Sequence, residues 1–198
     1  MLINIKKIFF CLTAAIICTT GLHHLKAQEP TAQLKKTTQH VINTLTDEKL
    51  SEEKQLKQLR NIVNKRFDWP NMSRRALGHH WLNLSDKNKE EFTELFSRLL
   101  EDKYLEKLKQ YSDKTEIEYK NEKIDKDYAS IDTIAKVENR ENVYITYRLH
   151  REQDKWLVHD VVIENVSLVN NYRSQFNSML ARMSFEKLLD KIRAKVAK

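Results

Sequence analysis

Glycine is scarce in this chain, whose 198 residues contain only Gly21 and Gly78. Phosphate-binding loops need several glycines close together, because side chains would keep the backbone away from the phosphates. The G-x-S-x-G turn that presents a catalytic serine likewise needs a glycine on each side of that serine. The sequence therefore excludes the P-loop, the dinucleotide-binding fingerprint and this class of serine hydrolase.

Cysteine is equally rare, and its two examples are Cys11 and Cys18. Both lie in an N-terminal segment that we expect to be removed. The remaining chain would then have no disulfide, no thiol nucleophile and no thiolate metal site. Neither cysteine follows the Leu-small-small pattern of a lipoprotein signal, which argues against a lipid-anchored product.

The first 27 residues have the layout of a secretory signal peptide. Lys6 and Lys7 form a basic start, residues 8–20 are an apolar run, and Ala27 is the small residue before a cleavage point. The alternative is a retained membrane anchor, but the run is too short to cross about 30 Å of hydrocarbon as a helix. We therefore expect residues 1–27 to be a signal peptide.

Charge is abundant but mixed in sign. The whole chain carries +7, and the loss of Lys6, Lys7 and Lys26 with the signal would leave +4. No run of five or more like charges occurs, so there is no evident nucleic-acid-binding arm. A mild positive excess suits brief contact with anionic head groups or acidic proteins, although an ordinary solvated surface would look the same.

Residues 28–198 have a length that suits one domain.

The hydrophobic period of that domain changes twice along the chain. Apolar residues recur at helical spacing in the first and last parts, and alternate as in half-buried strands between them. Ser51 and Ser85 are placed as helix N-caps, Pro70 as a first-turn proline and Gly78 as a helix stop. Helices are predicted around 34–45, 56–63, 70–77, 85–104, 169–183 and 185–196, and strands around 117–119, 130–137, 143–150 and 156–163.

Short polar connections between the predicted strands indicate antiparallel hairpins. In the segment 143–150, apolar and polar residues alternate, which gives one apolar face. Helices before and after a run of antiparallel strands favour the α+β class, with the helices gathered on one face of a curved sheet.

Residues that could carry catalysis or bind a metal are scattered. His79 and His80 are adjacent, whereas a metal pair on a helix is usually three or four residues apart. Asp68, Asp160 and Glu164 could converge as acid and base, but capping and ion-pairing are commoner roles for such residues. We therefore predict no catalytic residues and no metal site. An exported enzyme using Asp68, Asp160 and His159 is kept as the weakest alternative.

The most informative segment runs from Trp156 to Phe176 and reads W-L-V-H-D-V-V-I-E-N-V-S-L-V-N-N-Y-R-S-Q-F. It resembles the W-x-V-x-D-V-x-x-E-G-V-S-L-V-x-N-Y-R-x-Q-F block of the MlaC family of periplasmic phospholipid-binding proteins. The family's glycine is Asn165 here, and asparagine tolerates the left-handed backbone better than most residues. A second block supports the resemblance through Phe67, Asp68, Met72, Ala76, Leu77, Gly78, Trp81, Phe92 and Phe96.

The resemblance implies an apolar pocket between the sheet and the helices that holds the acyl chains of a phospholipid as cargo. It also implies a periplasmic carrier that shuttles lipid between an outer-membrane lipoprotein–porin complex and an inner-membrane ABC transporter, to maintain outer-membrane lipid asymmetry. No other cofactor is implied, and a monomer suffices. The residues expected to bind lipid are Trp81, Phe92, Phe96, Val143, Ile145, Tyr147, Leu149, Val161, Ile163, Val169, Asn171, Tyr172, Arg173 and Phe176, with Asn171 and Arg173 near the head group.

Two alternatives to this function remain open. One is a carrier for a hopanoid or another apolar lipid. The other is an adaptor of a transporter that binds no ligand, in which the same apolar faces form an ordinary filled core, since protein interiors are normally close-packed.

Overall fold

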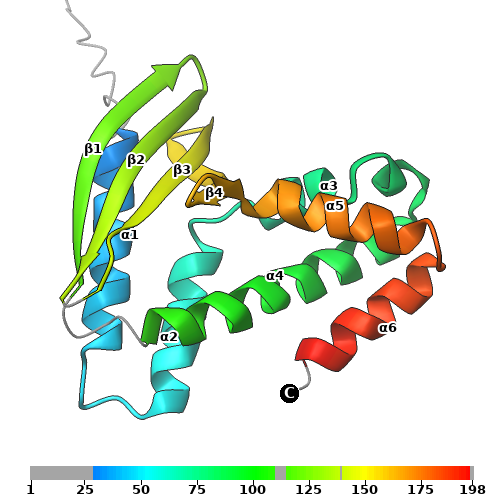
Figure 1. The fold of residues 1–198 in the computed structure, drawn as a ribbon, viewed down its shortest axis with the longest axis horizontal. Coiled ribbons are helices and arrows are strands. Elements are labelled where there is room, and N and C mark those ends of the chain that lie inside the picture. The colour runs from blue at the N-terminus through cyan, green and yellow to red at the C-terminus, as the bar shows by residue number, and fades with distance from the viewer. Residues whose placement is uncertain (1–28, 110–114, 139, 197–198) are drawn as a thin grey trace, which may run out of the picture.

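The structure is a computed structural model. It describes residues 29–109, 115–138 and 140–196 (Figure 1). The signal peptide predicted for residues 1–27 lies outside these residues. In the described part, helices α1 to α4 precede the strands, and α5 and α6 follow them. Their bounds are α1 Pro30–Leu45, α2 Glu52–Asn64, α3 Trp69–Leu77, the 3-10 helix η1 Gly78–Asn83, α4 Asp86–Lys109, β1 Thr115–Asp125, β2 Tyr128–Val137, β3 Val143–Glu152, β4 Lys155–Ile163, β5 Val166–Ser167, α5 Leu168–Leu180 and α6 Phe185–Val196.

The sheet is an antiparallel meander in the order β1-β2-β3-β4-β5. Two-residue turns connect β1 to β2, β3 to β4 and β4 to β5. In the last of these, Glu164 (φ 48°) and Asn165 (φ 63°) both have a left-handed backbone, as the tight hairpin turn with two such residues requires. Asn165 therefore takes the conformation that its tolerance of positive φ leads one to expect.

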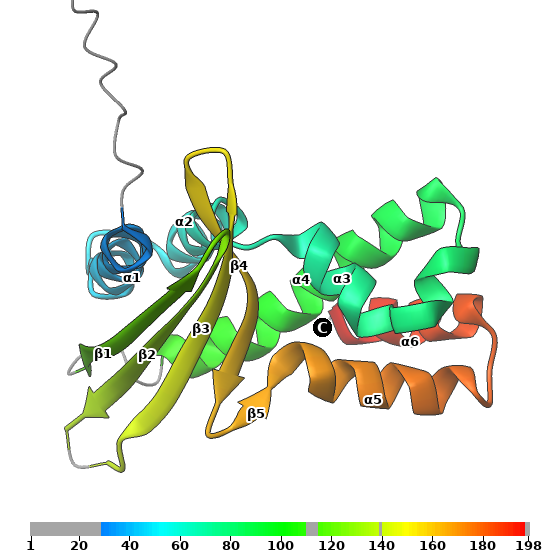
Figure 2. The ribbon, with the colours of Figure 1, turned by 90° about the horizontal axis from the view of Figure 1, so that it is seen from above.

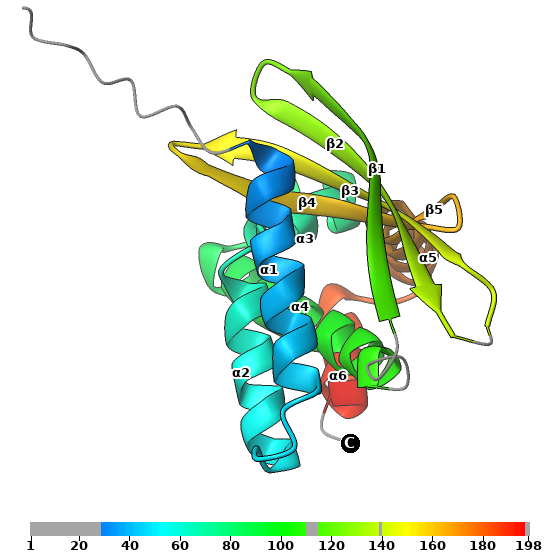
Figure 3. The ribbon, with the colours of Figure 1, turned by 90° about the vertical axis from the view of Figure 1, so that its left-hand side faces the viewer.

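One face of the sheet packs against α1, which lies across the strands (Figure 3). Leu34 of α1 meets Ile131 of β2 and Leu149 of β3 in a buried cluster, here called the sheet core. Because side chains alternate along a strand, the even-numbered residues of β3, such as Tyr144 and Arg148, lie on the opposite face. The sheet core consists of Leu34, Ala129, Ile131, Leu149, Trp156, Val158, Val161 and Leu168.

The helices α3 to α6 extend beyond the β4–β5 edge of the sheet (Figure 2). Their shared interior, here called the helical core, is built on interlocking rings. The ring centroids of Phe96 lie 5.3 Å from Tyr172 and 5.6 Å from Phe176, in edge-to-face geometry that suits aromatic pairs. Its buried members are Trp69, Met72, Ala76, Leu77, Phe92, Leu95, Phe96, Leu100, Val169, Tyr172, Phe176, Leu188, Leu189 and Ile192.

The helix ends follow the local sequence. The Asp68 carboxylate accepts a hydrogen bond of 3.0 Å from the Asn71 N–H at the start of α3, and Gly78 ends that helix with φ 58°. Ser85 caps α4 by accepting from the Asn88 N–H. Ser51 occupies the N-cap position of α2, but its side chain makes no capping hydrogen bond in the described residues.

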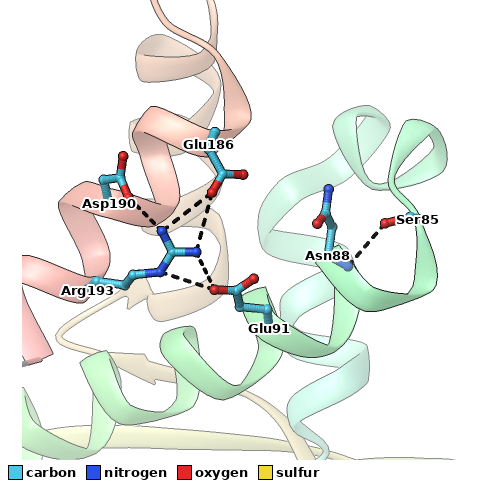
Figure 4. A network of polar contacts seen from close by, with 6 residues as sticks. All are labelled: Ser85, Asn88, Glu91, Glu186, Asp190 and Arg193. Atoms are coloured by element: carbon cyan, nitrogen blue, oxygen red, sulfur yellow. Dashed lines mark hydrogen bonds and ion pairs between the residues drawn. The ribbon is translucent and has the colours of Figure 1, made fainter.

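Helix α6 is held on α4 by one arginine as well as by apolar packing (Figure 4). Arg193 forms ion pairs with Glu91 of α4 and with Glu186 and Asp190 of its own helix. The Arg193 Nη1–Asp190 Oδ1 distance is 2.6 Å. These contacts hold α6 against α4 at the surface of the helical core.

The predicted α+β class and the antiparallel sheet are confirmed. The sequence patterns missed β5, which is two residues long, and the 3-10 helix η1. Both are too short to develop a hydrophobic period.

Candidate functional site

The sheet face that receives α1 is not closed over its whole length. Near Leu34 the side chains are fully buried, but toward β5 and the end of α4 several apolar side chains are only half-buried. These residues pack against the sheet core from its rim, and we call them the rim residues. They are Tyr104, Tyr119, Ile145, Tyr147 and Ile163.

Tyr147 is the most telling rim residue. Burial raises the pKa of its phenol, and the neighbouring Tyr119 raises it further, so the side chain is deeply surrounded by protein. The same side chain nevertheless keeps accessible surface. Tyr147 lies among the half-buried apolar residues of this face, between Ile145 and the buried Leu149, so it is well placed to touch a ligand on the face.

Tyr119 connects this face to α1. Its hydroxyl and the Thr38 hydroxyl are hydrogen-bonded, and the Lys35 ammonium lies 4.9 Å from the centre of its ring. Burial raises the pKa of Tyr119, and the hydrogen bond from Thr38 opposes that rise. The edge strand β1 is thereby held to the helix beside the half-buried face.

Tyr104 marks the boundary between the two halves of the molecule. It packs against both the helical core and the sheet core, as does Phe67. Burial raises the pKa of Tyr172 to about 12, with Tyr104 contributing. The Lys103 ammonium lies 5.6 Å from the ring centre of Tyr104 and 5.7 Å from that of Tyr172. Tyr104 and Tyr172 thus lie together where α4 meets α5, and Tyr104 also packs against the sheet core.

The structure divides the residues expected to bind lipid into two groups. In the sheet, Val143 is half-buried and lies opposite Ala135, while Leu149 and Val161 belong to the sheet core and Ile145, Tyr147 and Ile163 to its rim. In the helical half, a set of aromatic and apolar side chains fills the interior, with ring centroids 5.3 to 5.6 Å apart among its packed aromatic members. That set comprises Phe92, Phe96, Val169, Tyr172 and Phe176, with Trp81 half-buried beside them.

Arg173 and Asn171, the two residues expected near a head group, lie on α5. The Arg173 guanidinium passes over Gly78: a Cβ built on that glycine would lie 3.0 Å from Arg173 Nε. Arg173 thus covers the junction of α3 and η1, on the helical side of the molecule. Asn171 is half-buried. A role for either in binding a head group stays a prediction.

The three residues weighed for an exported enzyme, Asp68, Asp160 and His159, have structural partners. Asp68 caps α3 and its other carboxylate oxygen lies 2.6 Å from His150 Nε2. Asp160 accepts hydrogen bonds from the Ser167 hydroxyl (2.7 Å) and the Val169 N–H (3.1 Å), which ties β4 to the start of α5.

His159 lies beside the Arg75 guanidinium, with 3.2 Å between His159 Nδ1 and Arg75 Nη1. Burial lowers its pKa to about 4, and Arg75 adds to that effect. It is therefore neutral at neutral pH and has its partner in α3. Across residues 29–109, 115–138 and 140–196, no group of three or more His, Cys, Asp and Glu is arranged to hold a metal ion.

Two rim residues were missed in the sequence. Tyr119 belongs to the alternating pattern of its strand, and Tyr104 follows Leu100 by one helical turn, so both carried a visible signal. The sequence could not predict how the end of α4 approaches β1 and β3, because that approach depends on the tertiary fold.

A protein-family model matches most of this chain. The family model described as "MlaC protein" matches residues 35–194. This chain belongs to the MlaC family. The match spans both halves of the molecule, from α1 to α6, so membership applies to the whole described domain and the resemblance seen in the sequence is confirmed.

A solved structure has the same fold. It is the phospholipid-binding protein from Ralstonia solanacearum, determined in complex with a phospholipid, and it aligns with a TM-score of 0.77 at 22% sequence identity. The alignment covers 86% of this chain and 99% of that chain. No curated protein sequence matches this chain. Within the described residues, none of the helices has the length and apolar character needed to span a membrane.

Proposed function

We propose that this MlaC family member is a periplasmic carrier that binds one phospholipid and releases it to partner complexes. The observation that carries the proposal is the half-buried apolar face of the sheet, where Ile145, Tyr147 and Ile163 pack against the sheet core and keep accessible surface. Family membership and a structural neighbour solved with a phospholipid support this choice of ligand.

The acyl chains would lie between the open part of the sheet face and the helices. Ile145, Tyr147 and Ile163 would contact them from the sheet, and Tyr104 and Tyr119 from the borders. The tyrosine rings offer apolar faces while their hydroxyls can bond to polar groups at the border of the site. The helical core, whose aromatic residues already fill its interior, would support one wall.

Apolar burial is sufficient to hold such a ligand. Each buried CH₂ group contributes about 0.8 kcal/mol relative to water. Two acyl chains of about 15 carbons would then gain on the order of 20 kcal/mol, and a bilayer offers them nearly the same. The carrier therefore needs only to shield the chains in transit.

Direction of transport would come from partners, because a passive binder shifts populations only by differential affinity. In this proposal an outer-membrane lipoprotein–porin complex and an inner-membrane ABC transporter exchange lipid with the carrier, which maintains outer-membrane lipid asymmetry. Nothing in the proposal requires catalysis: Asp68, Asp160 and His159, the residues weighed for it, already serve as caps or lie beside other charged groups.

The test is native mass spectrometry of the protein exported to the periplasm and purified without detergent, with solvent extraction of bound molecules. A folded protein with one phospholipid mass is the expected result. A mass of a hopanoid or another apolar lipid would reassign the cargo. A folded, empty protein that also takes up no phospholipid from added vesicles would contradict the carrier proposal and favour an adaptor.

A further inference from the structure

A second hollow lies outside the proposed lipid site, between α1, α2 and the turn that joins β3 to β4. Its volume is about 470 Å³. The charged side chains that line it are Lys36, Lys65, Arg66, Lys155 and Asp154, and His40 is among the uncharged ones. Four permanent cations therefore face one carboxylate in a concave site.

The lysines of this hollow carry exposed positive charges. Lys36, Lys65 and Lys155 are exposed, and none forms an ion pair in the part of the chain that the structure describes. Arg193 and Arg151 are matched by nearby carboxylates, whereas the hollow gathers several cations, unpaired among the described residues, around one concave site. The positive potential of the hollow is thus left unbalanced.

Arg66 adds a further positive charge to this hollow. Its guanidinium donates to the Thr37 hydroxyl (2.9 Å), the Gln33 side-chain carbonyl (2.9 Å), the Trp156 carbonyl (2.6 Å) and the Gln33 carbonyl (3.4 Å). All four acceptors are neutral, so the charge is held in place but not compensated. A guanidinium has five N–H donors, which leaves one on Nη2 without an acceptor among the described residues. Burial also lowers the pKa of Arg66, a sign that its charge is partly desolvated.

The hollow is separate from the proposed lipid site. Gln33 faces the hollow, whereas the next residue, Leu34, belongs to the sheet core. Leu34, Leu149 and Val158 are at most 2% exposed, so closed packing lies between the hollow and the rim residues. The head group of a lipid bound at Tyr147 would therefore not account for the cations.

We propose that this hollow is a docking site for an acidic segment of a partner protein, whose carboxylates bind to Lys36, Lys65 and Lys155 beside the fixed charge of Arg66. Charge complementarity identifies the occupant, and such pairing steers association and sets specificity. A membrane surface fits less well, because stable interfacial binding also needs buried apolar area. Of the residues lining the hollow, only Ile62 is a large apolar one, and it is half-buried.

The probe for this site is a fluorescently labelled hexaglutamate peptide, measured by fluorescence anisotropy with the purified protein at low ionic strength, where such contacts are least screened. The test variant is Lys36→Glu with Lys65→Glu. Its matched control is Lys187→Glu with Lys191→Glu on α6, which changes the net charge equally at two exposed residues far along the chain. Circular dichroism checks that both remain folded; if the double variant does not, Lys36→Glu alone serves in its place.

The expected result is a Kd at least about tenfold weaker for the test variant and changed by less than about twofold for the control. Equal weakening in both variants, or no binding of the peptide by the unaltered protein, would overturn the proposal. A third outcome would also overturn it: the protein binds phosphatidylglycerol vesicles, does not bind phosphatidylcholine vesicles, and does not bind the peptide. None of these outcomes depends on whether Tyr147 contacts a lipid, so this site and the carrier proposal are tested separately.

Discussion

The two halves of the molecule bury their apolar residues differently. In the helical core, Phe92, Phe96 and Phe176 are 0–3% exposed and their rings interlock at 5.5 to 5.6 Å. On the sheet, Ile145 and Tyr147 share a face with the buried Leu149 but remain half-buried. A filled interior stabilises the fold, whereas an unfilled apolar face is available to a ligand. From this comparison we expect the helices to supply most of the stability and the sheet face to be where the proposed cargo binds.

The halves are joined at a narrow junction. Val158 of β4 donates to the Arg66 carbonyl (2.8 Å), and the Asp68 N–H donates to the Val158 carbonyl (2.9 Å). Phe67, between these two, packs against both cores. The segment that leads from α2 to α3 thus acts almost as an added strand beside β4, and it positions the helical half against the open sheet face.

The largest expected contrast comes from truncating one residue of each half. Phe96→Ala removes a ring that contacts Phe92, Tyr172 and Phe176, and should lower the free energy of unfolding by about 3–5 kcal/mol. Ile145→Ala removes a half-buried side chain and should cost about 1 kcal/mol in lipid-free protein. Urea unfolding of both delipidated variants measures this. Equal losses would mean that the sheet face is as closed as the helical core.

A buried acid in the helical half should make that half less stable as pH rises. Burial raises the pKa of Glu101 on α4 to about 7, with Arg60 opposing the rise. The folded protein therefore holds a proton that the unfolded chain, with the ordinary value of 4.5, releases. Between these values the free energy of unfolding falls with rising pH, by up to about 3 kcal/mol.

Glu101→Gln should remove this fall and stabilise the protein above pH 7, as measured by urea unfolding across the pH range. The Glu101 Oε1 atom has no hydrogen-bond partner among the described residues, so the neutral amide loses little. Glu94→Gln, on an exposed part of the same helix, is the control. A pH profile that Glu101→Gln leaves unchanged would contradict this account.

A buried base in the sheet half should have the opposite dependence. The folded pKa of His159 is about 4, below its ordinary value of 6.5, so the unfolded chain binds a proton that the folded protein does not. Stability is therefore lost as pH falls through this interval, by about 2 to 3 kcal/mol. His159→Gln should flatten the acid side of the profile, while His79→Gln at an exposed residue should not. An unchanged acid limb in His159→Gln would refute the assignment.

The smallest expected effect is at the surface of the helical half. Arg193→Gln removes the ion pairs that hold α6 to α4 (Figure 4). Because exposed ion pairs are screened by salt, we expect a slightly lower Tm at low ionic strength and no difference at high salt. Arg182→Gln, an exposed arginine without an ion pair among the described residues, is the control. A large drop in Tm that persists at high salt would show that α6 depends on Arg193 for more than charge.

Local sequence determined most of the fold. Pro70, Gly78 and Ser85 mark helix ends because their backbone or capping preferences act within a few residues. The period-two pattern of residues 143–150 identified the apolar face of β3 for the same reason. The antiparallel order follows from short connections, of two residues in three cases and five residues between β2 and β3, that leave no room for crossovers.

The site was harder to predict because both halves are apolar. Phe92 and Ile145 look alike in a hydrophobic pattern, yet one fills the helical core and the other lines the rim. The difference depends on how closely distant elements approach, and only tertiary packing determines that. The basic hollow was hidden for a similar reason, since Lys36, Lys65 and Lys155 are far apart in the chain and form no charge run.

The most direct test of the central claim, that the sheet half holds the cargo, is lipid occupancy by native mass spectrometry in two variants of one strand. Tyr147→Asp places a charge on the half-buried face, and Tyr144→Asp places it on the opposite face, where Tyr144 is 57% exposed. Because burying an unpaired charge is costly, Tyr147→Asp should fold but lose at least about nine-tenths of its bound lipid, while Tyr144→Asp keeps the wild-type amount. Val143→Trp, which fills space without adding charge, serves if Tyr147→Asp does not fold. Equal lipid occupancy in Tyr147→Asp and Tyr144→Asp would place the lipid elsewhere and contradict the account.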